Sequence, residues 1–247
     1  MRFKLLSCEV FYREMCASIA RSPHQVDVEF VSKGLHDLGG RAMRKALQEK
    51  IDGVSGSYDA ILLGYALCGN GLGGIEARGL PLVIARAHDC IGLLMGSRER
   101  YAEFFEANPG TYFRSTGWLE RGKTVHQLPA GTNAGNASLD DLIERYGEEN
   151  GRYLFEEFTR YQQQYRHLTY IESGLEADSS FEQEARSEAS ARGWEFSKIR
   201  GSLTLFQQLV NGEWPEKDFL VIPPGGRIAA SHDGHIVRLE PLERRGD

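Results

Sequence analysis

Two continuous apolar stretches, at residues 60–67 and 80–85, most constrain what this chain can fold into. Short apolar runs of this kind are typical of strands buried on both faces in the middle of a parallel sheet. Segments with helical periodicity flank them, at residues 38–52 and 97–107, and Ser97 stands at the N-cap position of the second. Such an alternation of strands and helices indicates right-handed crossovers and a parallel sheet.

The same alternation occurs in both halves of the chain. Strand patterns are present at residues 3–8, 26–31, 60–67, 80–85, 167–171, 195–199 and 219–222. Helix patterns are present at residues 9–20, 38–52, 97–107, 181–192 and 203–209. We therefore predict an α/β fold made of two Rossmann-like βαβ halves with parallel strands. The halves either share one sheet or form two lobes with a cleft between them.

We predict three segments along the chain. Residues 1–120 form an N-terminal α/β half, and residues 166–247 form a C-terminal α/β half. Residues 121–165 connect them, with a loop rich in Gly, Asn and Thr at 121–137 followed by polar helices at 138–165.

The charge balance narrows the classes of function. With 35 acidic and 29 basic side chains the formal net charge is −6, which argues against a general nucleic-acid binder, because such proteins present a basic face. No apolar stretch approaches the roughly 18 residues of a membrane-spanning helix. The stretch before Cys8 is also shorter than the about 7–15 apolar residues of a secretion signal. We expect a cytoplasmic protein without a membrane partner, whose four cysteines are not structural disulfides.

Three cysteines and a histidine stand where predicted strands end. Cys8 ends the first strand, Cys68 ends the third, and His88 and Cys90 follow the fourth. In a flavodoxin-like strand order these three strands are neighbours, about 4.8 Å apart, so the four side chains can converge on one point. Three thiolates and an imidazole suit tetrahedral Zn²⁺. Asp89 is then a candidate to orient the His88 ring, and an open fourth position would make the site catalytic.

Two other interpretations of these residues stay open. The cysteines can be small buried packing residues, with His88 a hydrogen-bonded loop residue. Alternatively, Cys68 can be a nucleophile with His88 as its base. The fourth cysteine, Cys16, lies two helical turns after Cys8, and we expect it in the core.

A glycine-rich turn and a helix start are candidates for holding a substrate. The turn after the third strand matches neither a phosphate-binding P-loop nor a dinucleotide fingerprint, but its backbone N–H groups could approach an anion. An arginine at the start of the helix at 97–107 could hold a carboxylate or phosphate, and a tryptophan further on is a candidate pocket wall. The predicted substrate-binding residues are Gly69, Asn70, Gly71, Arg98 and Trp118.

Several segments of the chain resemble the bacterial and archaeal domain-of-unknown-function family 1638. They are residues 63–71, 81–91, 96–101, 110–119 and 219–225, together with the start at Cys8. Proteins of this kind look to be encoded near corrinoid-dependent methyltransferases that act on methylated amines and related one-carbon donors. The resemblance also carries over onto the cysteines and histidine at the strand ends.

These observations lead to three hypotheses about function. The first is a zinc-thiolate enzyme that takes part in methyl or one-carbon transfer, in which zinc lowers the pKa of a small-molecule substrate thiol. Its metal ligands would be Cys8, Cys68, His88 and Cys90. The second is a non-catalytic protein that holds a metal or a corrinoid for a partner methyltransferase. The third is a metal-free hydrolase or acyltransferase that depends on Cys68.

Overall fold

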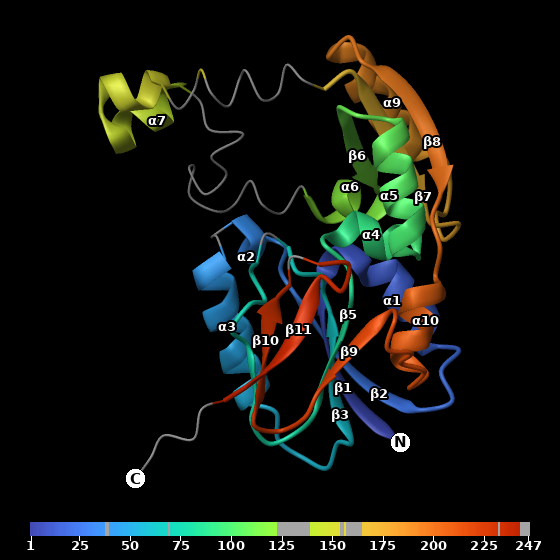
Figure 1. The fold of residues 1–247 in the computed structure, drawn as a ribbon. Helices are drawn as coiled ribbons and strands as arrows, with labels where there is room; N and C mark the ends of the chain where they lie inside the picture. Colours follow the sequence, from blue (N-terminus) through green and yellow to red (C-terminus); the bar gives the residue numbers. More distant parts are fainter. Residues whose placement is uncertain are drawn as a thin grey trace.

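The computed structural model of the chain describes residues 1–37, 40–68, 70–122, 139–153, 156, 165–231 and 233–242. These residues form two lobes, one above the other in Figure 1, each built on its own sheet. The fold is mixed α/β with parallel strands in both lobes, as the alternation in the sequence predicts.

A five-stranded sheet forms the centre of the larger lobe, in the order β2-β1-β3-β5-β9. Its strands are β1 (Arg2–Cys8), β2 (Gln25–Val31), β3 (Ala60–Gly64), β5 (Leu82–Ala85) and β9 (Phe219–Ile222). The first four are mutually parallel. The prediction that β1, β3 and β5 are neighbours is confirmed, and their carboxyl ends therefore meet at one edge of the sheet.

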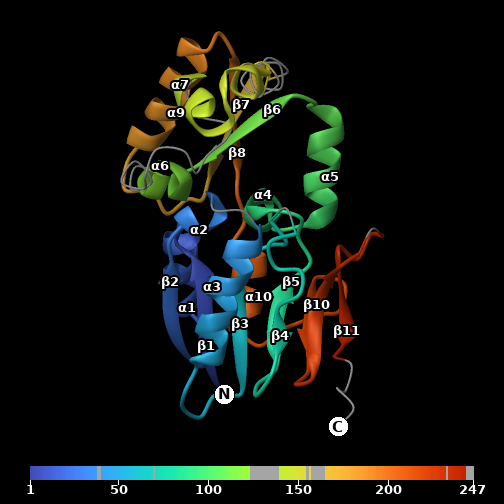
Figure 2. The same cartoon turned by 90° about the vertical axis from the view of Figure 1, so that its left-hand side faces the viewer.

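Helices cover both faces of this sheet (Figure 2). On one face lie the 3₁₀ helix η1 (Glu9–Phe11), α1 (Tyr12–Ile19), α4 (Cys90–Met95) and α10 (Thr204–Val210). On the other face lies α3 (Gly40–Asp52), preceded by the short α2 (Gly34–Asp37). The prediction that Cys16 lies in the core is wrong: its side chain is exposed, because α1 turns Met15 and Ser18 inward instead.

Side chains of the central strands alternate between the two cores, as the pleat of a strand requires. Leu5 pairs with Leu62 and faces the core under α1, while Leu6 pairs with Leu63 and faces the core under α3. All four are 0% exposed. Burying a leucine contributes about 1.5–3 kcal/mol, so strands that are apolar on both faces hold the two layers of helices together.

A small antiparallel sheet extends the larger lobe. It consists of β4 (Glu76–Ala77), β10 (Gly226–Ala230) and β11 (Val237–Pro241), in the order β11-β10-β4. Ile228 and Val237 are both 0% exposed and join the core under α3. Buried Arg86, which follows β5, connects this sheet to the larger one. It donates to the carbonyl oxygens of Glu216, at 2.7 Å, and of Val237 in β11. The sequence patterns did not predict these short strands.

The smaller lobe has a three-stranded parallel sheet in the order β6-β7-β8. Its strands are β6 (Thr111–Ser115), β7 (His167–Glu172) and β8 (Glu195–Arg200), and its helices are α5 (Arg98–Ala107), α6 (Thr116–Gly122) and α9 (Ser180–Ala191). Ser97 caps α5 as predicted, accepting from the Arg100 N–H at 3.2 Å. The helix α7 (Leu139–Tyr146) falls within the predicted helical stretch. Residues 123–138, most of the predicted loop, lie outside the described residues.

The last strand predicted from the sequence, at residues 219–222, does not pair with the other strands of the C-terminal half. β9 pairs with β5 of the larger lobe and runs antiparallel to it, with Phe219 opposite Ala85. After α10 a short connection brings the chain to the carboxyl end of β5. Because β9 begins beside that end, it runs antiparallel to β5. Residues 166–247 therefore contribute strands to all three sheets.

Close contacts join the two lobes at α1 and α6. Arg13 donates to both carboxylate oxygens of Glu120, at 3.0 and 3.1 Å, and to the Leu175 carbonyl at 3.0 Å. A Cβ added at Gly117 would lie 1.6 Å from the carbonyl oxygen of Val10, so only glycine lets α6 approach the backbone of η1 this closely. None of the described helices has both the length and the apolar character needed to span a bilayer.

A buried carboxyl beside this junction predicts a pH dependence of stability. Glu14 is 1% exposed, neither of its oxygens has a hydrogen-bond partner among the described residues, and burial raises its pKa to about 7 from an ordinary 4.5. The folded chain therefore binds this proton more tightly than the unfolded chain does. The contribution of the protonated Glu14 to the free energy of unfolding is fully present below about pH 4.5. It decreases by about 3 kcal/mol as the pH rises to about 7.

Glu14→Gln removes this titration. Urea unfolding should show that the variant gains stability over the wild type between about pH 5 and about pH 8. The exposed residue Glu103 provides the control, because Glu103→Gln should change stability equally at both values. A difference between wild type and Glu14→Gln that stays constant with pH would contradict the buried titration.

Candidate functional site

Cys8, Cys68 and Cys90 line one pocket at the carboxyl ends of β1, β3 and β5. The accessible volume of the pocket is about 20 Å³, enough for about one water molecule, and its other walls are mostly apolar. Trp118 of α6 also lines it, as the sequence predicts. The structure thus brings together three of the four predicted ligands and one predicted pocket wall.

Backbone pairing beyond the strand ends holds two of the cysteines in place. The Leu67 N–H donates to the Ala87 carbonyl at 3.0 Å, and the Cys68 N–H donates to the His88 carbonyl at 2.9 Å. These bonds continue the alignment of β3 and β5 into the loops that follow. Cys68 has φ 48°, in the left-handed region that non-glycine residues rarely adopt, and such strain is found more often at functional sites than elsewhere.

Burial favours the protonated form of two of the thiols, those of Cys68 and Cys90. It raises the pKa of Cys68 to about 12 and raises the pKa of Cys90 well above its ordinary value. The Trp118 Nε1–H donates to the Cys90 sulfur at 3.3 Å, which favours the thiolate and opposes part of this rise. Neighbouring thiols disfavour each other's charge, since Cys8 also raises the pKa of Cys68. None of these cysteines is in a disulfide.

Two polar residues of the pocket were missed by the sequence analysis. Lys33 is only 7% exposed, and its Nζ lies 4.4 Å from the centre of the Trp118 ring. Tyr65 is 4% exposed, and its hydroxyl has no hydrogen-bond partner among the described residues. Lys33 lies two residues after β2 and Tyr65 directly follows β3. The strand-end rule could have located Lys33 but not Tyr65, because the predicted strand at 60–67 includes Tyr65.

His88 and Asp89 are not positioned in the structure as their predicted roles require. His88 is exposed and is not among the described residues that line the pocket, and its carbonyl accepts from the Cys68 N–H. Asp89 caps α4, accepting from the Gly92 N–H at 3.0 Å, and also accepts from the Tyr101 hydroxyl at 2.8 Å. This carboxylate fixes the helix that begins at Cys90, and no hydrogen bond to the His88 ring is among its contacts described here.

The predicted substrate-binding turn and arginine lie away from the pocket. Asn70 and Gly71 do not line it, and Gly71 packs against Met43 of α3, where a Cβ would lie 2.7 Å from the sulfur. Gly69 lies outside the described residues. Arg98 donates to the Gly234 carbonyl and pairs with Glu99 at 3.3 Å, so it holds the turn between β10 and β11.

The thiols are not a preformed metal site. Within the described ranges, no three His, Cys, Asp or Glu side chains are arranged to hold a metal ion. The donor set around the pocket is therefore three thiols without the predicted imidazole.

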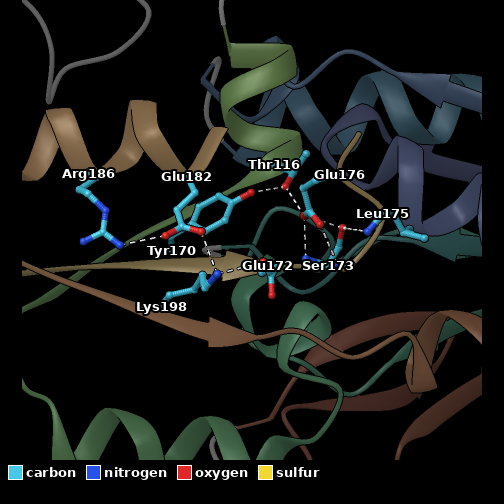
Figure 3. Close-up of polar contacts among 10 residues, drawn as sticks. Thr116, Tyr170, Glu172, Ser173, Leu175, Glu176, Glu182, Arg186 and Lys198 are labelled. Atoms are coloured by element: carbon cyan, nitrogen blue, oxygen red, sulfur yellow. Dashed lines mark hydrogen bonds and ion pairs between the residues drawn. The ribbon is translucent and has the colours of Figure 1, made fainter. Parts of the chain in front are cut away.

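A second polar cluster lies at the carboxyl ends of β7 and β8 in the smaller lobe (Figure 3). Lys198 pairs with Glu172 at 3.1 Å and with Glu182 at 2.8 Å. Glu176 accepts from the hydroxyls of Thr116 at 2.5 Å and Ser173 at 2.8 Å. These carboxylates already have partners within the chain, and we interpret the cluster as a support for the smaller lobe.

The chain matches a family model described as a protein of unknown function, DUF1638, over residues 30–210. It belongs to this family. The matched region runs from β2 to α10 and includes Cys68, Cys90 and Trp118, so the resemblance seen in the motifs is confirmed. No curated protein and no solved structure matched the chain. Because DUF1638 is described as a family of unknown function, the chemistry of the pocket is inferred from the pocket's own residues.

The burial of the pocket cysteines predicts an order of thiol reactivity. Only a thiolate that reagent can reach is alkylated rapidly. Exposed Cys16 should therefore react with iodoacetamide at least about ten-fold faster than Cys68 and Cys90, as followed by peptide mass spectrometry. In urea the differences should vanish. Equal rates in the folded protein would mean that the pocket thiols are not buried as described.

Proposed function

We propose that this protein is a metal-thiolate protein that takes part in methyl or one-carbon transfer, with Cys8, Cys68 and Cys90 as metal ligands. The observation that carries the proposal is the convergence of three thiols, from three separate strand ends, on one pocket. Buried thiols with raised pKa values gain most from a bound cation, because the cation replaces their protons and holds the thiolates.

The donor set suits zinc. Three sulfur ligands leave one of the four tetrahedral positions of Zn²⁺ for a substrate, which is the pattern of a catalytic rather than a structural zinc. When bound, zinc would lower the pKa of a substrate thiol and make it a nucleophile toward a methyl group. The chain's own contribution is to orient the ligands: Trp118 donates to the Cys90 sulfur, and Asp89 caps the helix that begins there.

A second candidate is a non-catalytic protein that holds a metal or corrinoid for a partner methyltransferase. The observation in its favour is that no carboxylate or imidazole is among the described residues lining the pocket. Such a lining lacks the imidazole and carboxylate groups that most often act as general bases. A catalytic protein should consume a methyl donor in the presence of a thiol, whereas a holding protein should bind without turnover.

The geometry gives less support to a metal-free hydrolase or acyltransferase. That function needs a thiolate at Cys68 and a base within hydrogen-bond reach. Burial raises the pKa of Cys68 to about 12, and exposed His88 does not line the pocket. A cytoplasmic location is part of the first proposal, since a reducing compartment keeps thiols available as ligands.

Metal content tests the proposal. Protein purified without chelators should contain about one equivalent of zinc, and Cys68→Ser should lose most of it while the circular dichroism spectrum stays unchanged. Cys16→Ser is the matched control, because this cysteine is exposed and is not among the residues that line the pocket. It should keep both the metal and the melting temperature.

Two outcomes would contradict the proposal. One is a wild-type protein that takes up neither zinc nor cobalt when these ions are added to the reduced form. The other is full metal content in both Cys68→Ser and Cys90→Ser, which would mean that the pocket thiols are packing residues.

A further inference from the structure

Glu14 is a buried carboxyl at the junction of the two lobes, and its position there serves neither the thiol pocket nor a helix cap. It projects from α1 beside Arg13, the residue that holds Glu120 of the smaller lobe. Glu14 is 1% exposed, and neither of its oxygens has a hydrogen-bond partner among the described residues. A carboxyl buried in this way is favoured in its neutral, protonated form.

The nearest charged groups oppose the ionisation of Glu14 on balance. Glu176, in the loop after β7, and Glu120 of α6 both disfavour a negative charge on this side chain, and Arg13 favours one. Arg13 is already bound to both oxygens of Glu120 and to the Leu175 carbonyl. Both acidic neighbours belong to the smaller lobe. An ionised Glu14 therefore works against the packing of this lobe on α1.

The charges on the other elements packed against α1 are engaged elsewhere. Helix α10 carries no titratable side chain. In β1, Arg2 and Lys4 pair with acidic residues of β2, and in η1, Glu9 accepts from a hydroxyl and a backbone N–H of the loop after β2. Arg121 of α6 lies over the ring of Tyr12, 4.3 Å from its centre. None of these groups is therefore placed to neutralise an ionised Glu14.

The packing of the smaller lobe also controls access to the thiols. Trp118 of α6 lines the thiol pocket and donates to the Cys90 sulfur at 3.3 Å. Glu120, which Arg13 holds, lies only two residues further along α6. The pocket has room for about one water molecule, so it must open before a reagent can reach its sulfur atoms. A movement of α6 away from α1 would withdraw Trp118 and open it.

We propose that Glu14 is a proton-dependent switch of the lobe junction. The protonated carboxyl lets α6 pack against η1 and α1 with the thiol pocket closed, and the ionised carboxyl releases α6 so that the pocket opens to solvent. This inference concerns access to the pocket and holds with or without a bound metal.

The direction of the pH dependence follows from the two environments of the carboxyl. In the packed junction burial raises the pKa of Glu14 to about 7, whereas in the open junction the carboxyl meets water and regains an ordinary value near 4.5. The packed state therefore binds the proton more tightly, and it is fully favoured below about pH 4.5. The open state gains population as the pH rises toward about 7.

Alkylation of Cys90 by iodoacetamide measures this opening in the folded protein. Comparing the wild type with Glu14→Gln at the same pH cancels the titration of the thiol itself. The ratio of the wild-type rate to the variant rate, followed by peptide mass spectrometry, should rise about ten-fold from pH 6 to pH 8. Glu14→Met, which also removes the carboxyl, should behave as Glu14→Gln does. The control Glu103→Gln, at an exposed position, should follow the wild type.

Amide hydrogen exchange in β3 separates local opening from unfolding of the whole chain. This strand is buried at the centre of the larger lobe, so its amides should exchange only on global unfolding. Cys90 should become accessible at least about ten-fold more often than the β3 amides, with little dependence on low concentrations of urea.

Two results would overturn the switch. One is a ratio between wild type and Glu14→Gln that stays constant with pH, and the other is equal opening frequencies for Cys90 and the β3 amides. Neither result depends on metal content, so the proposed function stands or falls separately.

Discussion

The parallel pairing of β1, β3 and β5 is the interaction on which the rest of this structure depends. Parallel neighbours present their carboxyl ends at the same edge, so residues distant in the sequence meet there. The pairing continues past the strands, where the Cys68 N–H bonds the His88 carbonyl. This backbone alignment, rather than any contact between side chains, sets the three cysteines around one pocket.

Burial sets the chemistry of this pocket. Desolvation disfavours every charge, which raises the pKa values of Cys68 and Cys90 and keeps them protonated in the empty protein. The same desolvation makes any bound cation or anion interact more strongly with its partners. In the proposed function, a soft metal would replace the protons of these buried thiols.

The smaller lobe completes the pocket instead of merely flanking it. Trp118 belongs to α6 of that lobe, yet it contacts Cys90 and Lys33 of the larger lobe. Its position depends on the close approach at Gly117 and on the paired contacts between Arg13 and Glu120. Because these contacts fix α6 against η1, the wall of the pocket that Trp118 forms depends on the packing of the two lobes.

Local periodicity in the sequence determined the α/β class, most strands and helices, and the placement of Cys8 at the end of β1 and of Cys68 and Cys90 in the segments that follow β3 and β5. These features follow from short-range patterns, since strands and helices bury their apolar faces with periods that can be read along the chain. The role of His88 did not follow, because a loop side chain can turn toward solvent while its carbonyl stays bound. Neither did the antiparallel entry of β9, the exposure of Cys16, or the meeting of Lys33 with Trp118. Those outcomes were decided by tertiary structure alone, because each depends on which surfaces meet when segments far apart in sequence pack together.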